Sequence, residues 1–191
     1  MTLAAVFERV VNALESARAQ YVVVGSTAAA AWGVVRSTRD VDLAMAVAGD
    51  EAQAIVGELE GDDLYFPAHD ATAALAHGGS FNVLHPATGG KVDVFVWSPG
   101  DAFERSRLDR RVRSEILGVA AWVATPEDIV LSKLRWRRTS GSEVQWRDCV
   151  EIAASQTLDR QYLNEWAVPL GVADDLADLL AAVDAARAED S

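Results

Sequence analysis

The chain has 191 residues, of which 50% are apolar and 24% are charged, and its formal net charge is −12. This composition is ordinary for a folded domain, and the length allows one well-cored domain or a domain with a helical annex. The acidic balance argues against a protein that coats nucleic acid through nonspecific phosphate contacts. No apolar run approaches the roughly 20 residues of a membrane-spanning helix, so no membrane partner is expected.

The expected compartment is the cytoplasm. The segment from Met1 to Val11 lacks the basic head of a signal peptide. The single cysteine, Cys149, excludes an internal disulfide and is predicted to be a buried thiol in a helix. The three histidines have no ligand partners nearby in sequence and are predicted to be surface residues; they are His69, His77 and His85.

The first third of the chain alternates helical and strand patterns. Leu3, Val6 and Val10 recur at helical spacing, and Tyr21 to Val24 is a short apolar run that ends at Gly25. The predicted elements are a helix over 3–19, a strand over 21–24, a helix over 28–32, a strand over 41–47 and a helix over 50–60.

The middle of the chain is less regular. Residues 61–80 show no clear pattern, whereas a Pro- and Gly-containing turn over 85–90 separates two runs that predict a hairpin. The predicted elements are strands over 80–84 and 91–97, a charged helix or loop over 101–113 and one strand over 116–123.

The last part is predicted to be helical. Thr125 is a favourable N-cap, with Pro126 at the first helical position and acids in the first turn. Helices are predicted over 126–138, 143–156, 159–168 and 172–188. Strands in the middle and helices at the end indicate an α/β (α+β) protein. Its predicted parts are a core over 1–125 and a helical region over 126–191, packed on the core as a single compact unit.

The segment from Gly25 to Asp42 has features of a site for phosphate and metal. Gly25 allows close backbone approach to a ligand, free N–H groups at the start of a helix favour a phosphate, and Ser26 adds a hydroxyl. Asp40 and Asp42 are two apart in an apparent strand, so their side chains leave one face, about 7 Å apart at Cα. Two such carboxylates repel each other unless a cation lies between them, and magnesium binds carboxylate and phosphate oxygens together.

A third acid, Asp93, lies between Val92 and Val94 in a later apolar run. If its strand lies beside that of Asp40 and Asp42, the three acids can hold two metals about 3.5–4 Å apart for phosphoryl chemistry. Each piece alone has an ordinary explanation as a helix cap, a turn or an exposed acid. The combination is much more specific than its parts.

The combination resembles the signature of the DNA polymerase beta-like nucleotidyltransferase superfamily: Gly followed by Gly or Ser, a spacer, then acid–apolar–acid. Within it, Gly25-Ser26-Thr27-Ala28-Ala29 and Arg36-Ser37-Thr38-Arg39-Asp40-Val41-Asp42-Leu43 are most similar to the AbiEii-type group of toxin-related and uncharacterised bacterial nucleotidyltransferases. Residues 125–134 resemble that group's later helix, and Arg147-Asp148 resembles the pair on its next helix. The resemblance covers about residues 20–155.

The resemblance implies a nucleotidyltransferase fold, with a small mixed sheet flanked by helices, and an NTP donor. It implies that Asp40 and Asp42 ligate Mg2+ (or Mn2+), with Asp93 as third ligand or base. Gly25 and Ser26 would hold the triphosphate. Further residues in or near the implied site are Arg36, Arg39, Lys133 and Asp148.

Several alternatives stay open for these polar residues. Lys133 is either a phosphate cation or a surface lysine. Asp148 orients Lys133, acts as a base toward the acceptor, or pairs with Arg135 or Arg138. Arg36 and Arg39 either border the substrate or are simply solvated.

The acceptor also stays open. It is a hydroxyl on tRNA, protein or a small molecule, and a cognate toxin or antitoxin is a candidate partner. A non-catalytic antitoxin-like or regulatory module is the alternative to an enzyme. An antibiotic-modifying transferase is disfavoured, because related aminoglycoside enzymes place an Arg soon after Gly-Ser, where this chain has alanines.

The charge is uneven along the chain. Between Asp101 and Arg147 there are ten Lys or Arg against seven acids, a local balance of +3. This basic middle suits a localised anionic ligand such as a tRNA end, with an ordinary solvated helix face as the alternative.

Overall fold

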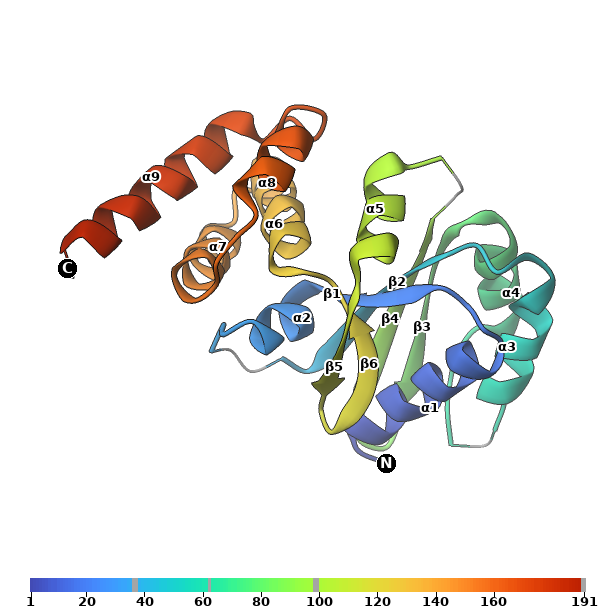
Figure 1. The fold of residues 1–191 in the computed structure, drawn as a ribbon. Coiled ribbons are helices and arrows are strands. Elements are labelled where there is room, and N and C mark those ends of the chain that lie inside the picture. Colours follow the sequence, from blue (N-terminus) through green and yellow to red (C-terminus); the bar gives the residue numbers. More distant parts are fainter. Residues whose placement is uncertain (36–37, 62, 98–99, 190–191) are drawn as a thin grey trace. The chain divides into compact units, whose positions relative to one another are not determined.

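The computed structural model describes residues 1–35, 38–61, 63–97 and 100–189. Its internal contacts group the chain into two compact units. Unit 1 comprises Met1–Thr27 and Ser37–Ala124, and unit 2 comprises Ala28–Arg36 and Thr125–Ser191. In Figure 1 unit 2 includes the helices coloured from yellow-orange to red.

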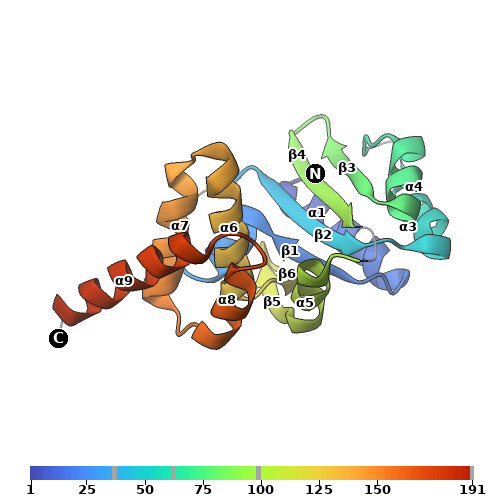
Figure 2. The same cartoon turned by 90° about the horizontal axis from the view of Figure 1, so that it is seen from above.

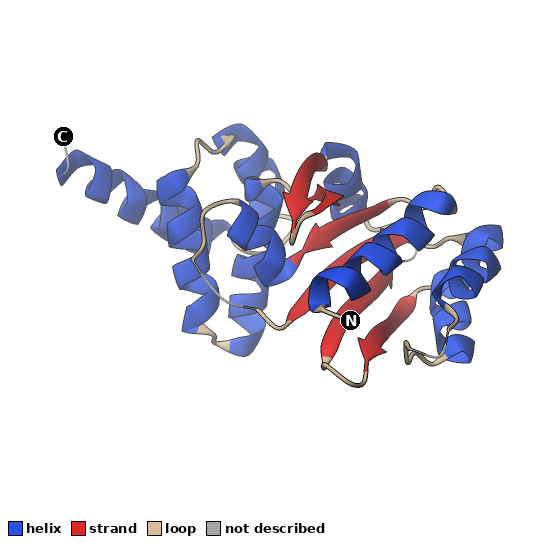
Figure 3. Ribbon diagram, turned by 90° about the horizontal axis from the view of Figure 1, so that it is seen from below, coloured by secondary structure: helices blue, strands red, loops and turns tan. Residues whose placement is uncertain are grey.

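Unit 1 is built on a six-stranded sheet with the order β3-β4-β2-β1-β6-β5, drawn in red in Figure 3. The pairs β2–β4 and β1–β6 are parallel, and the other neighbours are antiparallel. This mixed sheet confirms the predicted fold class. The strands are β1 (Tyr21–Val24), β2 (Asp40–Ala46), β3 (Gly79–His85), β4 (Gly90–Trp97), β5 (Val112–Ile116) and β6 (Val119–Val123).

One face of the sheet carries the core of unit 1. Val92 and Val94 are buried and share a face with Gly90, whose Cα lies close to Leu3 and Val6. Figure 3 shows α1 lying across this face. The helices of unit 1 are α1 (Leu3–Ser16), η1 (Gly49–Glu51, a 3-10 turn), α3 (Ala52–Leu59), α4 (Ala68–His77) and α5 (Ala102–Arg110).

The structure differs from the predicted elements of unit 1 in two places. Helix α4 lies in the segment that showed no pattern, because its buried face consists mainly of small residues, Ala71 and Ala74 with Leu75. The single strand predicted over 116–123 is a hairpin of β5 and β6. Its turn is at Leu117 and Gly118, which both have positive φ values, 53° and 83°.

Unit 2 is helical, as predicted. Thr125 caps α6 by accepting a hydrogen bond from the backbone N–H of Asp128, and Gly141 ends the helix in the left-handed conformation. The helices are α6 (Pro126–Ser140), α7 (Glu143–Ser155), α8 (Arg160–Ala167) and α9 (Ala173–Glu189). Figure 2 shows the same helices from above.

Helix α2 (Gly25–Ala31) begins in unit 1 and ends in unit 2. The sequence prediction placed all of residues 1–125 in the core, but 28–36 belong to unit 2. The reason is local: Ser155 Oγ and Gln156 Nε2, at the end of α7, donate hydrogen bonds to the carbonyl oxygen of Trp32 at 2.9 and 3.3 Å.

Cys149 and His85 are both buried. Cys149 is buried in α7, as predicted, and burial raises the pKa of its thiol to about 12, which keeps it neutral. His85 was predicted at the surface and is instead buried, with Nδ1 2.8 Å from Thr88 Oγ1. None of the helices in the described part of the chain is long and apolar enough to cross a membrane.

Candidate functional site

Three aspartates share one face of the sheet in unit 1. Asp42 on β2 is the register partner of Asp93 on β4, and Asp40 is the partner of Lys91. Side chains alternate along a strand and match across a pair, so these four residues leave the face opposite the one packed on α1. The condition set by the sequence, that the strand of Asp93 lies beside that of Asp40 and Asp42, is therefore met. We call Asp40, Asp42 and Asp93 the acidic row.

Gly25 lies against this row. It follows β1, whose last residue, Val24, is the antiparallel partner of Asp42. Its φ is +67°, and a Cβ added there would lie 2.1 Å from Oδ2 of Asp42. Any side chain at position 25 would thus displace the carboxylate, so glycine leaves room for Asp42 and also suits the backbone conformation.

Two threonines hold the start of β2. Thr27 Oγ1 donates to the carbonyl oxygen of Asp40 at 3.1 Å. Thr38 Oγ1 lies 3.0 Å from both that carbonyl and the carboxylate Oδ1 of Asp40, within donating distance of each. These hydrogen bonds orient Asp40, and the sequence analysis missed them. The sequence offered one indication of this role: Thr27 follows Gly25-Ser26, and Thr38 lies two residues before Asp40.

Lys91 is the other residue that the sequence analysis missed. Its Nζ lies 2.7 Å from Oδ2 of Asp93 and 3.7 Å from Oδ2 of Asp40. The hydrogen bond with Asp93 raises the pKa of Lys91 above its usual value, and the charges of Asp93, Asp40 and Asp42 add to the effect. The signal in the sequence was its place two residues before Asp93, on the same face of the strand.

The acidic row fits a divalent metal by its chemistry. Three carboxylates from two directly paired strands are hard oxygen donors of the kind that Mg2+ and Mn2+ bind. In the described residues, however, no group of three or more His, Cys, Asp or Glu is arranged to hold an ion as it stands. Asp93 is instead turned toward the ammonium group of Lys91. The row therefore carries the right donors, with Lys91 as their present counter-ion.

Lys133 and Asp148 lie in unit 2, on α6 and α7. Lys133 Nζ lies 2.7 Å from Oδ2 of Asp148 and 3.1 Å from Oε1 of Gln145. Only 5% of Lys133 is exposed, so the alternative of a surface lysine is wrong. Asp148 is held by Lys133, one of the roles left open for it. The implied role of either residue toward a nucleotide stays a prediction.

The remaining site predictions concern the segment before β2 and the start of α2. Ser26 is half-buried beside Gly25, and Arg39 is exposed next to Asp40. Arg36 lies outside the described residues. The roles implied for these residues toward the triphosphate also stay predictions.

Several arginines in the basic middle of the chain form ion pairs within their own unit. Arg107 pairs with Glu104 and Arg113 with Glu15, both in unit 1, while Arg137 and Arg138 share Asp175 in unit 2. Arg111 and Arg113 also lie over the ring of Trp122. Arg105, Arg135 and Arg147 are exposed, so a solvated face stays an alternative for these three.

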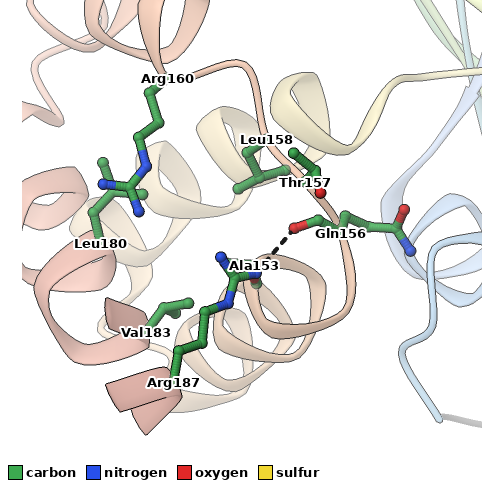
Figure 4. Close-up of a pocket in the computed structure, with 8 residues that line it drawn as sticks. All are labelled: Ala153, Gln156, Thr157, Leu158, Arg160, Leu180, Val183 and Arg187. Atoms are coloured by element: carbon green, nitrogen blue, oxygen red, sulfur yellow. Dashed lines mark hydrogen bonds between the residues drawn. The ribbon is translucent and has the colours of Figure 1, made fainter. Parts of the chain in front are cut away.

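A small pocket of about 70 Å³ lies in unit 2, and Figure 4 shows the residues that line it. Its two arginines are already engaged. Arg187 donates to backbone carbonyls at the end of α7, including that of Ala153 at 2.9 Å, and Arg160 pairs with Asp184. Both arginine side chains of the pocket are thus held by contacts within unit 2.

The sheet and the acidic row beside Gly25 define a protein of the nucleotidyltransferase class. Residues 1–170 match the family described as nucleotidyltransferase of unknown function (DUF6036), and the chain belongs to this family. The match confirms the predicted nucleotidyltransferase relationship. The narrower resemblance to the AbiEii-type group stays a prediction. No curated protein sequence matches the chain.

Solved structures share the fold. An antigenic nucleotidyltransferase-like protein from Paracoccidioides brasiliensis is similar with a TM-score of 0.57 and 20% identity, over 93% of this chain and 91% of that one. The complex of ANT(2")-Ia with adenylyl-2"-tobramycin is similar with a TM-score of 0.55 and 12% identity, over 87% and 95% of the two chains. At these identities the likeness supports the fold alone.

Proposed function

We propose that this protein transfers a nucleoside monophosphate from an NTP to a hydroxyl acceptor in a metal-dependent reaction that releases pyrophosphate. The proposal depends on the placement of Asp40, Asp42 and Asp93 on one face of two paired strands, directly beside Gly25. Membership of a nucleotidyltransferase family supports it.

Each residue of the candidate site has a separate role in the proposed reaction. The acidic row would hold Mg2+ or Mn2+, which supplies charge stabilisation for the triphosphate and lowers the pKa of the acceptor hydroxyl. Gly25 lets the main chain approach the β and γ phosphates, and Ser26 donates a hydrogen bond to them. The acceptor oxygen forms a bond to the α-phosphorus, the bond between that phosphorus and the pyrophosphate oxygen breaks, and Asp93 is our candidate to accept the hydroxyl proton.

Thr27 and Thr38 orient Asp40 without being candidate metal ligands themselves. Their hydrogen bonds to Asp40 fix the backbone at the start of β2 and one carboxylate oxygen. Positioning a metal ligand in this way is a known requirement for affinity and activity. The family resemblance implies that Lys133 offsets the triphosphate charge and that Asp148 orients Lys133.

The acceptor is best sought in three classes. The net charge of −12 is compatible with a polycationic small molecule, and the complex of ANT(2")-Ia contains adenylyl-2"-tobramycin. The internal pairing of Arg107, Arg113, Arg137 and Arg138 weakens the case for a tRNA end. A protein acceptor, including a cognate toxin or antitoxin partner, is the third class.

The proposal is tested by incubating the protein with each α-labelled NTP and Mg2+ in the presence of tobramycin, total RNA or a protein lysate. We expect metal-dependent pyrophosphate release and label transfer to one acceptor class. Calorimetry with the same nucleotides measures binding separately from turnover. Metal-dependent binding with no product over hours would instead favour a non-catalytic regulatory module.

Substitution of Gly25 by Ala tests the contact with Asp42. We expect it to lower stability by about 1–3 kcal/mol through backbone strain and to reduce turnover further by displacing the carboxylate. Gly89→Ala is the matched control, because Gly89 has a similar φ of +70° but nothing within 4 Å of an added Cβ. Urea unfolding and pyrophosphate release would be measured on both. Equal turnover in the two variants would contradict the assigned role of Gly25.

A further inference from the structure

The ammonium group of Lys91 lies among the candidate metal ligands. Nζ lies 2.7 Å from Asp93 Oδ2 and 3.7 Å from Asp40 Oδ2, and the negative charge of Asp42 also acts on it. Lys91 is attached two residues before Asp93 on the same face of β4. A positive charge on the chain itself thus offsets an acidic row whose members would otherwise repel one another.

We propose that Lys91 is a tethered counter-ion, which stabilises the acidic row in the absence of metal and leaves it when a divalent cation binds. This inference rests on the proposed function, because it assigns the row to a metal. A carboxylate oxygen that contacts an ammonium group at 2.7 Å cannot also take a metal at about 2.0–2.1 Å without bringing two cations together. The two cations therefore compete for Asp93.

The geometry makes this exchange inexpensive for the fold. The side chain of Lys91 is 37% exposed, so its flexible stem can carry Nζ into solvent without a change in the pairing of β4 with β2. A partly exposed ion pair contributes little to stability, and its loss is readily offset by metal coordination. The buried pair of Lys133 and Asp148 has no such freedom, since only 6% and 3% of their side chains are exposed.

Competition predicts weak binding of free metal to the native protein. Without Lys91 the same carboxylates should bind a divalent ion about tenfold more tightly, because a like charge a few ångströms away has been removed. A metal that arrives with an NTP brings phosphate oxygens as further ligands and gives the released ammonium group a new anionic partner. Lys91 would thereby favour the metal–nucleotide complex over the metal alone.

Binding of Mn2+ without nucleotide, measured by electron paramagnetic resonance, tests the proposal. We expect Lys91→Met to bind about tenfold more tightly than native protein. Lys91→Arg, which keeps the charge, should bind much as the native protein does. Arg105→Met is the matched control, because it removes one positive charge from an exposed position on α5 that makes no ion pair within the described residues.

A second measurement uses the native protein and does not depend on the folding of a variant. The sequence contains two lysines, so [13C]lysine labelling gives a simple NMR spectrum. Addition of Mg2+ should shift and sharpen the side-chain signals of Lys91 while those of Lys133 stay in place. Assignment follows from the spectrum of Lys91→Arg.

The outcomes separate the inference from the proposed function. If native protein binds Mn2+ but Lys91→Met binds no more tightly, or the Lys91 signals do not respond to Mg2+, the counter-ion role is wrong and the metal site stands. If neither protein binds Mn2+ alone, the counter-ion role is overturned, and the proposed metal-dependent function falls with it only if Mn2+ also fails to bind in the presence of an NTP.

Discussion

Asp42→Asn is expected to lower NTP-dependent pyrophosphate release by about a thousandfold or more, since metal placement supplies much of the transition-state stabilisation in this chemistry. Asp42 is central to the acidic row: it is the register partner of Asp93, and its carboxylate fills the space that Gly25 leaves. Asparagine keeps the shape of the side chain and removes its charge. The fold should therefore persist while turnover is lost.

Stability and turnover must be measured together for this variant. Removal of one of three neighbouring negative charges relieves repulsion, so the melting temperature should not fall. Asp109→Asn provides the control, because it removes an exposed acid on α5 outside the row and should leave turnover unchanged. Pyrophosphate release by Asp42→Asn at the native rate would show that the acidic row is not the catalytic centre.

The face carrying the acidic row was predictable because strand periodicity is local. Alternation within 40–43 and within 91–94 fixed which side chains leave together, and the hairpin of β3 and β4 was confirmed. The direct pairing of β2 with β4 is different, since the intervening chain includes α3, α4 and β3. Packing against other elements decides which strands pair and in which register. The sequence alone therefore could not predict that β4 lies beside β2.

The missed elements share a physical cause. Helix α4 buries mainly alanines, which give little contrast between an apolar and a polar face. The turn between β5 and β6 uses Leu117 at positive φ, a conformation that leucine rarely takes and that sequence patterns do not signal. In both places tertiary packing decides the outcome over local preference.

The contacts of the two lysines were also not predictable from local sequence patterns. Each is held by an aspartate at 2.7 Å, Lys91 by Asp93 and Lys133 by Asp148. The partner is two residues away in the first pair and fifteen in the second. Their environments differ: the first pair is partly exposed, with 37% and 21% of the two side chains accessible, whereas the second pair is buried.

The buried pair predicts the largest effect on stability. Lys133→Met should lower the free energy of unfolding by about 3–5 kcal/mol, because it leaves the carboxylate of Asp148 buried without its cation. The double variant Lys133→Met/Asp148→Leu should recover much of this loss, since it removes both buried charges. Arg160→Met, which breaks the exposed pair with Asp184, should change unfolding in urea far less.

The double variant also separates a structural ion pair from a functional one. If its stability returns and turnover is still lost, the pair of Lys133 and Asp148 acts in the reaction, because misfolding no longer explains the defect. If turnover returns with stability, Lys133 and Asp148 serve only to join α6 to α7. A double variant as unstable as Lys133→Met alone would contradict the charge-burial explanation and assign the loss to packing of the lysine stem.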